Sequence, residues 1–245
     1  MQREAGMLGQ PRFGYRRLHV LLGREGFAVN HKRVYRRYRA EGLAVRRTRR
    51  IRLASDPRVP LPVVVRLNQQ WNMDFTLDSL AKGRRFRTLS IVDACTRECP
   101  AIEVDTSLPG ARVVRVLERL ADKRGLPKVI VVDNGPEFVC KAVDQWAHAH
   151  GVELQFIRPG KPIENAYIES FNGKLPGECL DQHWFLTLDQ ARRTIEAWRQ
   201  DYNEVRPHSV LENLTPAEVI RRWEAAQQHQ SQPAVAVCYR WALQN

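Results

Sequence analysis

The stretch VIVVDNGPEF, residues 129–138, places an acidic turn directly after a short apolar run. The run VIVV is mostly β-branched, which predicts a buried strand, and Asn134-Gly135 is a strong turn signal. Asp133 therefore lies where the strand ends, and ligands of open α/β sheets bind at strand ends. Two interpretations remain open here: Asp133 caps the turn or the following helix, or it is a functional carboxylate with partners elsewhere.

A second acidic residue lies in a predicted core strand. The segment WNMDFT, residues 71–76, alternates apolar and polar residues, as a half-buried strand does. Its polar face carries Asp74. A charge on a core strand is costly unless something compensates it, so Asp74 also needs an explanation. Asp78, Asp93 and Asp105 are expected to serve turns, and Glu137 is expected either to orient Asp133 or to cap the chain locally.

The elements between and after these two strands predict an α/β fold. Gly83 marks a hairpin turn, after which residues 86–96 and 101–107 form two further strands. A helix from Pro109 to Gly125, the strand 129–132, a helix over about 137–150 and a strand over 152–159 follow. The order βββαβαβ predicts a mixed sheet with helices packed on it.

Glu169 is the third carboxylate of interest, on the predicted helix AYIESFNGKL that follows the loop PGKPIEN, residues 159–165. A solvated glutamate is the plain alternative. If the first and fourth strands are neighbours and this helix lies across them, three oxygen donors meet, which suits Mg²⁺ or Mn²⁺. Two such ions about 3.5–4 Å apart would activate a water or a 3′-hydroxyl. Without metal the three carboxylates would raise one another's pKa.

The positive charge is confined to the N-terminal fifth of the chain. Residues 1–52 hold fifteen Lys/Arg and three Asp/Glu, a net charge of +12, whereas residues 53–245 hold twenty-four of each. Such segregation indicates a polyanion-binding module joined to a neutral body. Two short predicted helices, the second capped by Asn30, suggest a helix-turn-helix. A basic helical hairpin on the surface is the alternative.

The candidate DNA contacts are basic side chains of this module and of the body, without any assignable base readout. They are Arg16, Arg17, Lys32, Arg33, Arg36, Arg37, Arg46, Arg47, Arg49, Arg50, Lys161 and Lys174. We expect a helix-turn-helix module over 1–52, a proline-containing linker over 53–65, a catalytic core over 66–183, C-terminal helices over 184–226 and a tail over 227–245. Capping boxes at Thr187 and Thr215 predict where two of the C-terminal helices begin.

Cysteine usage and hydropathy exclude several classes of protein. Five cysteines are scattered without a CxxC pair, so a zinc site is poorly supported and reduced thiols in the cytoplasm are expected. No apolar run approaches the length of a membrane span, and no signal peptide begins at Met1.

Four motifs occur in order: WNMDFT, VDNGPEF, RPGKPIENAYIESFNGKL and YNEVRPHS, with thirty-five residues between Asp133 and Glu169. Together they resemble the DDE transposases of the third numbered bacterial insertion-sequence family, specifically the catalytic OrfB protein. The resemblance covers about residues 14–219. It implies a ribonuclease-H-like core similar to that of retroviral integrases, preceded by a helix-turn-helix.

The resemblance also implies a site and a reaction. Asp74, Asp133 and Glu169 match the metal-binding catalytic acids, which hold two Mg²⁺ or Mn²⁺ ions. The family cuts DNA strands with water and then joins them through a 3′-hydroxyl, without a covalent protein–DNA intermediate. The expected partners are terminal inverted repeats, target DNA, OrfA or the OrfAB fusion, and further copies of the chain on DNA, in the bacterial cytoplasm.

Two departures from the family pattern leave alternatives open. The position seven beyond Glu169 is normally a DNA-contacting Lys or Arg, but here it is Pro176, followed by Gly177. Proline removes that cation and is expected to break the helix, and Lys174 lies about 200° away on a helix. The chain also begins close to the helix-turn-helix, which suggests a shortened N-terminus. A weakened remnant that only binds DNA, and a nuclease without strand transfer, are the rival functions.

Overall fold

The computed structural model describes residues 13–43, 64–158 and 162–228. These residues form two units: residues 13–43 with 207–213, and the remaining described residues from 64 to 228. The module predicted over 1–52 lies in the first unit, although residues 207–213, which we expected among the C-terminal helices, group with it. Most of the predicted linker, 53–65, and tail, 227–245, lies outside the described residues.

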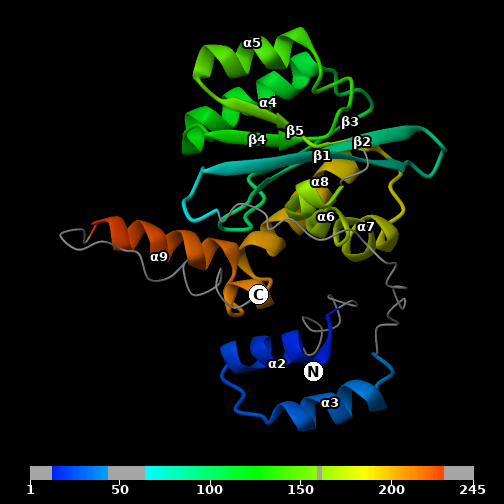
Figure 1. Cartoon of the computed structure of the whole chain (residues 1–245). Helices are drawn as coiled ribbons and strands as arrows, with labels where there is room; N and C mark the ends of the chain where they lie inside the picture. Colours follow the sequence, from blue (N-terminus) through cyan, green and yellow to red (C-terminus); the bar gives the residue numbers. More distant parts are fainter. Residues whose placement is uncertain (1–12, 44–63, 159–161, 229–245) are drawn as a thin grey trace. The chain divides into compact units, whose positions relative to one another are not determined.

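The second unit contains a five-stranded mixed sheet in the order β3-β2-β1-β4-β5 (Figure 1). Its strands are β1 (Gln70–Ser79), β2 (Arg85–Asp93), β3 (Ala101–Asp105), β4 (Val129–Val132) and β5 (Glu153–Phe156). The first three strands pair antiparallel, while β4 runs parallel to both β1 and β5. This confirms the predicted βββαβαβ order, and it places the first and fourth strands side by side, which the sequence left open.

Helices cover both faces of the sheet (Figure 1). On one face lie α4 (Gly110–Arg124) and α5 (Lys141–His150), and on the other α6 (Ala166–Asn172), α7 (Leu175–Glu178) and α8 (Leu188–Glu204). The described residues after β5 also form three short helices and one longer helix: η1 (Pro162–Asn165), η2 (Leu180–Gln182), η3 (Ser209–Leu211) and α9 (Pro216–Gln228).

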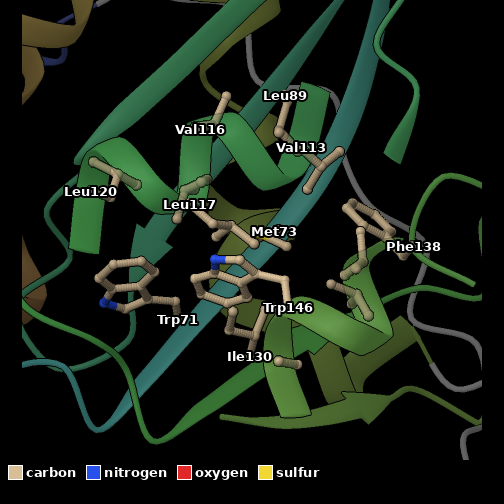
Figure 2. Close-up of a cluster of buried hydrophobic side chains, with 14 of the residues drawn as sticks. Trp71, Met73, Leu89, Val113, Val116, Leu117, Leu120, Ile130, Phe138 and Trp146 are labelled. Carbon is tan, nitrogen blue, oxygen red and sulfur yellow. The ribbon is translucent and has the colours of Figure 1, made fainter. Parts of the chain in front are cut away.

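The alternation of β1 divides the core into two layers. Trp71 and Met73 are fully buried beneath α4 and α5, where they pack with Leu117 and Trp146 (Figure 2). The opposite face packs a second apolar cluster against α6, α7 and α8. That opposite face also carries Asp74, so the sheet presents its acidic residue toward the helix that bears Glu169.

The two capping boxes form as predicted. Thr187 Oγ1 accepts the amide of Gln190 at 3.1 Å and so begins α8. At α9, Thr215 Oγ1 accepts the amide of Glu218 at 3.1 Å, and the Glu218 carboxylate accepts the amide of Thr215 at 2.6 Å.

Two helix predictions need correction. The helix predicted from about 137 begins only at Lys141, because residues 135–140 fold into turns in which Gly135 O accepts the amides of Phe138 and Val139. The helix that carries Glu169 ends at Asn172. Pro176 lacks an amide hydrogen to bond to Asn172 O, so it begins the separate helix α7 in its first turn.

In the first unit, residues 13–43 form the α-helices α2 (Tyr15–Arg24) and α3 (His31–Ala40). The Asn30 side chain accepts the amide of Lys32 at 2.8 Å and begins α3, as predicted. Gly26, with φ of +87°, makes the turn between the helices. A small core unites the helices and consists of Phe13, Leu18, Val34 and Tyr38.

Candidate active site

Asp74 lies in β1, and Asp133 directly follows the end of the neighbouring parallel strand β4. The parallel register pairs Asn72 of β1 with Val131 of β4, and each aspartate lies two residues farther along the chain. Neighbouring strands lie about 4.8 Å apart. The sheet thus brings together two carboxylates that are 59 positions apart in the sequence.

The turn after β4 fixes the Asp133 side chain. Its Oδ1 accepts the amide of Gly135 at 2.9 Å, while Asn134 Nδ2 donates to Ile157 O at 2.8 Å and ties the turn to the end of β5. A Cβ atom at position 135 would lie 2.9 Å from Asp133 Oδ1, so a larger residue there would require this carboxylate to shift. Asp133 therefore does cap its turn through Oδ1, while its Oδ2 makes no hydrogen bond to any of the described residues and is compatible with a functional role.

Glu169 is an exposed residue on α6, and the start of this helix is anchored to β1. Asn165 precedes the helix, where an N-cap side chain would ordinarily bond to the helix, but it makes no such bond. Its Oδ1 instead accepts Asn72 Nδ2 at 2.6 Å, and its Nδ2 donates to Met73 O at 3.3 Å. Both partners lie within two residues of Asp74, so the helix that carries Glu169 is fixed next to that carboxylate.

Asn172, one turn after Glu169, reaches Asp74 directly. Its Nδ2 donates to Asp74 Oδ2 at 2.8 Å, and the amide of Phe75 donates to Asp74 Oδ1 at 2.7 Å. The Asn172 Oδ1 atom is buried and has no hydrogen-bond partner among the described residues. A buried amide oxygen without a partner is costly and indicates a group that the site is built to receive.

The electrostatics connect the three acids. Burial raises the pKa of Asp74, and the negative charges of Asp133 and Glu169 raise it further, against the two hydrogen bonds that lower it. Glu169 and Asp133 thus act on Asp74 through space, as expected of a carboxylate cluster. Within the described residues, however, no three acidic, histidine or cysteine side chains form a ready group for a metal ion. Metal ligation by these three residues remains a prediction.

An ion pair holds the loop that follows Asp133. Arg87 of β2 donates to Glu137, which lowers the pKa of Glu137. The same guanidinium lies 4.3 Å from the ring centroid of Phe75, and Phe75 stacks on Phe138 with centroids 5.0 Å apart. Glu137 therefore anchors the loop to the sheet. Of its two expected roles, this contact favours the orientation of Asp133 over local capping.

The other acids that we weighed serve turns. Asp93 is fully buried, and its Oδ1 accepts the amides of Cys95 and Thr96 at 2.9 Å each. Asp78 and Asp105 each accept the amide of the next residue. The turn role that we expected for these residues is confirmed.

The predicted DNA contacts differ in their surroundings. Lys32, Arg33, Arg36 and Arg37 are all exposed on α3, as a recognition helix requires. In α2, Arg16 is exposed and lies over the Tyr15 ring. Arg17 lies 4.6 Å from the Phe13 ring centroid and donates to Pro207 O. It supports the fold of its own unit.

Lys174 lies two positions before Pro176, and its role as a DNA contact remains a prediction. Its ammonium donates to the backbone oxygen and the hydroxyl of Ser170, so it caps the end of α6. The predicted contacts Arg46, Arg47, Arg49, Arg50 and Lys161 lie outside the described residues.

The sequence analysis missed three asparagines that assemble the site: Asn72, Asn165 and Asn172. Two of them carried a signal in their spacing. Asn72 precedes Asp74 by two residues and so shares its strand face, and Asn172 follows Glu169 by three residues and so shares its helix face. Asn165 carried none, because its position suggested a helix cap and the structure uses its side chain elsewhere.

Comparison with known proteins places this geometry in a family. Residues 65–162 and 150–216 match two integrase core domain families, and residues 8–51 match a family of HTH-like domains. An uncharacterised 31.7 kDa protein of insertion element IS407 from Burkholderia multivorans is 52% identical over 214 residues, which cover 87% of this chain and 77% of that protein. The chain belongs to the insertion-sequence transposases.

A more distant relative and a solved structure agree with this assignment. Transposase InsD of insertion element IS2 from Escherichia coli is 28% identical over 225 residues, 86% of this transposase and 74% of InsD. A chain of the simian T-cell lymphotropic virus intasome, in complex with PP2A regulatory subunit B56 gamma, matches with a TM-score of 0.59 at 16% identity, over 73% of this transposase and 60% of that chain. The fold is therefore that of the ribonuclease-H-like integrase cores, as predicted.

The family assignment covers the catalytic type as well. The transposase is an OrfB protein of the third numbered insertion-sequence family and a DDE-type polynucleotidyl transferase, as the motifs indicated. Among its described helices, none has both the length and the apolar character of a membrane span.

Proposed function

We propose that this transposase cuts the DNA strands at the ends of its own insertion element and joins them to target DNA through Asp74, Asp133 and Glu169. The observation that carries the proposal is the placement of Asp74 in β1 and of Asp133 directly after the parallel neighbour β4. In addition to burial, the negative charges of Asp133 and Glu169 raise the pKa of Asp74. Three carboxylates that act on one another at a strand end form a site for cations.

The donor set fits a divalent cation. Carboxylate oxygens are hard ligands, and like charges this close favour a bound cation between them. The unpartnered Asn172 Oδ1 offers one further oxygen beside Asp74. Bound Mg²⁺ or Mn²⁺, as a pair of ions, would activate the attacking hydroxyl and stabilise the leaving oxygen of an in-line displacement. Asp74, Asp133 and Glu169 would hold them.

The remaining residues of the site position these acids. Asn172 and the Phe75 amide fix both oxygens of Asp74, and the Gly135 amide fixes one oxygen of Asp133. The Asn72–Asn165 pair holds the start of α6 on β1, and with it the backbone of Glu169. Phosphoryl transfer of this type relies on positioning and electrostatics, so such contacts contribute directly to the rate.

The N-terminal unit supplies DNA affinity in this proposal. Four exposed basic side chains on α3 suit contacts with DNA phosphates, and the predicted recognition helix would enter the major groove. The terminal inverted repeats, target DNA, OrfA or the OrfAB fusion, and further copies of the chain are the proposed partners.

One observation favours a weakened copy. With α6 ending at Asn172 and Lys174 bonded to Ser170, the described part of the chain offers no cation one turn or two beyond Glu169 on the same helix. A cation there would hold the DNA near the cut. The second candidate function is therefore that of a transposase that binds element ends and cuts them poorly.

Cleavage and joining assays on duplexes with the natural ends of the element test these proposals. The wild-type chain should cut and join only with Mg²⁺ or Mn²⁺ present. Cleavage without joining would identify a nuclease, and binding without cleavage a DNA-binding remnant. Pro176→Arg, assayed in parallel, should raise the cleavage rate if the missing cation limits the enzyme.

A further inference from the structure

Trp184 is a large aromatic side chain that is exposed to solvent near the C-terminal end of β1. Trp184 is 83% exposed and Leu186 is 63% exposed, although Phe185 between them is 1% exposed. Phe185 packs edge-on against Phe86, with ring centroids 5.9 Å apart. The segment therefore has a fixed orientation, with Phe185 in the core and its two neighbours outside. Exposure of a tryptophan from an anchored segment indicates a contact surface.

The segment is bonded to a basic hairpin. Phe185 O accepts the amide of Ala81 at 2.8 Å, so the segment that holds Trp184 is bonded to the chain at the β1–β2 turn. Gly83, with φ of +82°, closes that turn. On either side of Gly83 lie the exposed residues Lys82, Arg84 and Arg85.

These three cations have no ionic partner among the described residues. The acid nearest to Lys82 in the sequence is Asp78, whose carboxylate accepts the Ser79 amide, and the acid nearest to Trp184 is Asp181. Three cations against two acids leave the surface with a net positive charge. We name Lys82, Arg84, Arg85 and Trp184 the hairpin surface. Unpaired cations around an exposed aromatic ring suit a nucleic acid, whose phosphates meet the cations and whose bases or sugars pack on the ring.

The position of the hairpin surface limits which DNA it can meet. Leu80, directly after β1, lies six positions beyond Asp74, which is about 20 Å at a strand rise of about 3.3 Å per residue. That length equals about six base pairs of duplex at about 3.4 Å each. A duplex whose scissile phosphate lies at Asp74 is thus long enough to reach the hairpin surface.

We propose that the hairpin surface binds the same duplex that the transposase cuts, about six base pairs from the cut phosphate, with Trp184 packed on a base or sugar. The cations supply affinity that does not depend on base sequence, and the ring adds a contact that salt does not screen. This proposal rests on the proposed function, because it takes the acids as the place of cutting. It assigns to the catalytic unit a DNA contact separate from α3.

Binding of a natural element-end duplex to the full chain tests the proposal, measured by fluorescence anisotropy over a KCl series without divalent metal. Trp184→Ala should weaken binding about 5- to 100-fold with little change in salt dependence, while Trp184→Phe should bind nearly as the wild type does. The triple variant Lys82→Ala/Arg84→Ala/Arg85→Ala should lower the salt slope by up to about 2.7, or about 0.9 per lost phosphate contact.

A matched control removes three cations from α4 and the loop after it, on the other face of the sheet: Arg115→Ala/Lys123→Ala/Lys128→Ala. This variant loses the same formal charge and should keep nearly the wild-type affinity and slope. If the two triple variants change the affinity and the salt slope equally, duplex binding depends on net charge alone, and the proposal is wrong. Circular dichroism and thermal unfolding of each variant exclude a folding defect as the cause.

Two shortened duplexes locate the contact. One duplex is cut short three base pairs to one side of the cut phosphate, and the other is cut short three base pairs to the other side. The duplex that lacks the contacted base pairs should bind the wild-type chain and Trp184→Ala with equal affinity. If Trp184→Ala weakens binding to all duplexes by the same factor, or to target DNA alone, the proposal is wrong. A wild-type chain that binds through the hairpin surface but does not cut with metal would instead contradict the proposed function and leave the contact in place.

Discussion

The side-chain amide of Asn172 donates a 2.8 Å hydrogen bond to Oδ2 of Asp74 and so joins the helix of Glu169 to the strand of Asp74. The other amide atom, Oδ1, is buried without a partner. The Asn172 side chain thus fixes Asp74, lies one helical turn from Glu169, and has an amide oxygen that is available to a ligand of the site. In the proposed catalytic centre, this arrangement makes Asn172 a positioning residue.

Replacement of Asn172 by alanine should weaken the metal site without abolishing the fold. Because Asp74 loses its donor, we expect about 10- to 100-fold more Mg²⁺ for half-maximal cleavage, as is usual when a residue that orients a ligand is lost. Calorimetric titration of the DNA-free protein with Mn²⁺ should show a metal affinity that is lower by the same factor. An unchanged metal affinity in both experiments would contradict the positioning role.

The hydrogen bond between Asn72 and Asn165 should contribute to stability as a coupled pair. Asn72→Ala and Asn165→Ala each leave a buried amide without its partner, which costs about 1–3 kcal/mol. The double variant should lose less free energy of unfolding than the sum of the two, because the interaction is lost only once. Urea unfolding of the four proteins measures this coupling, and strict additivity would mean that the contact does not form.

Gly135→Ala should disable catalysis while the chain stays folded. The added Cβ would lie 2.9 Å from Asp133 Oδ1, so the carboxylate must move. We expect cleavage at least 100-fold slower, because misplacement of a catalytic group by about 1 Å costs that much. Gly23→Ala is the matched control, since a Cβ there has no neighbour within 4 Å. Full cleavage by Gly135→Ala would show that the turn tolerates the methyl group.

The Arg87–Glu137 ion pair should make the stability of the Asp133 loop depend on pH. Arg87 lowers the pKa of Glu137, so the pair contributes stability above the ordinary carboxyl pKa and loses it as the pH falls through the lowered value. Glu137→Gln should therefore unfold more readily than the wild type at pH 7, and the difference should vanish in acid. Thermal unfolding from pH 7 to pH 3 measures the effect. A difference that persists at the acid end would assign it to another cause.

The alternation and turn signals of the sequence predicted much of this fold. The β-branched run before Asp133, the alternation around Asp74 and the caps at Asn30, Thr187 and Thr215 depend on residues within a few positions of one another. The structure confirmed each of these elements. Neighbouring placement of the first and fourth strands was only one permitted arrangement before the structure assigned it.

What the sequence could not predict depends on distant partners. Asn165 resembled a helix cap, and only the fold shows that its side chain bonds to Asn72, 93 positions away. The start of α5 at Lys141 was likewise missed, because the turns after Gly135 are held by Arg87 of another strand. Trp184 carried no signal at all, since its exposure follows from how Phe185 packs.

The central claim is that Asp133, with Asp74 and Glu169, carries the metal-dependent chemistry. The most direct test compares the wild-type chain with Asp133→Asn on duplexes that carry the element ends, with cleavage and DNA binding measured on the same samples. We predict that Asp133→Asn abolishes Mg²⁺-dependent cleavage and binds the duplex nearly as the wild type does. Cleavage at the wild-type rate by Asp133→Asn would contradict the assignment.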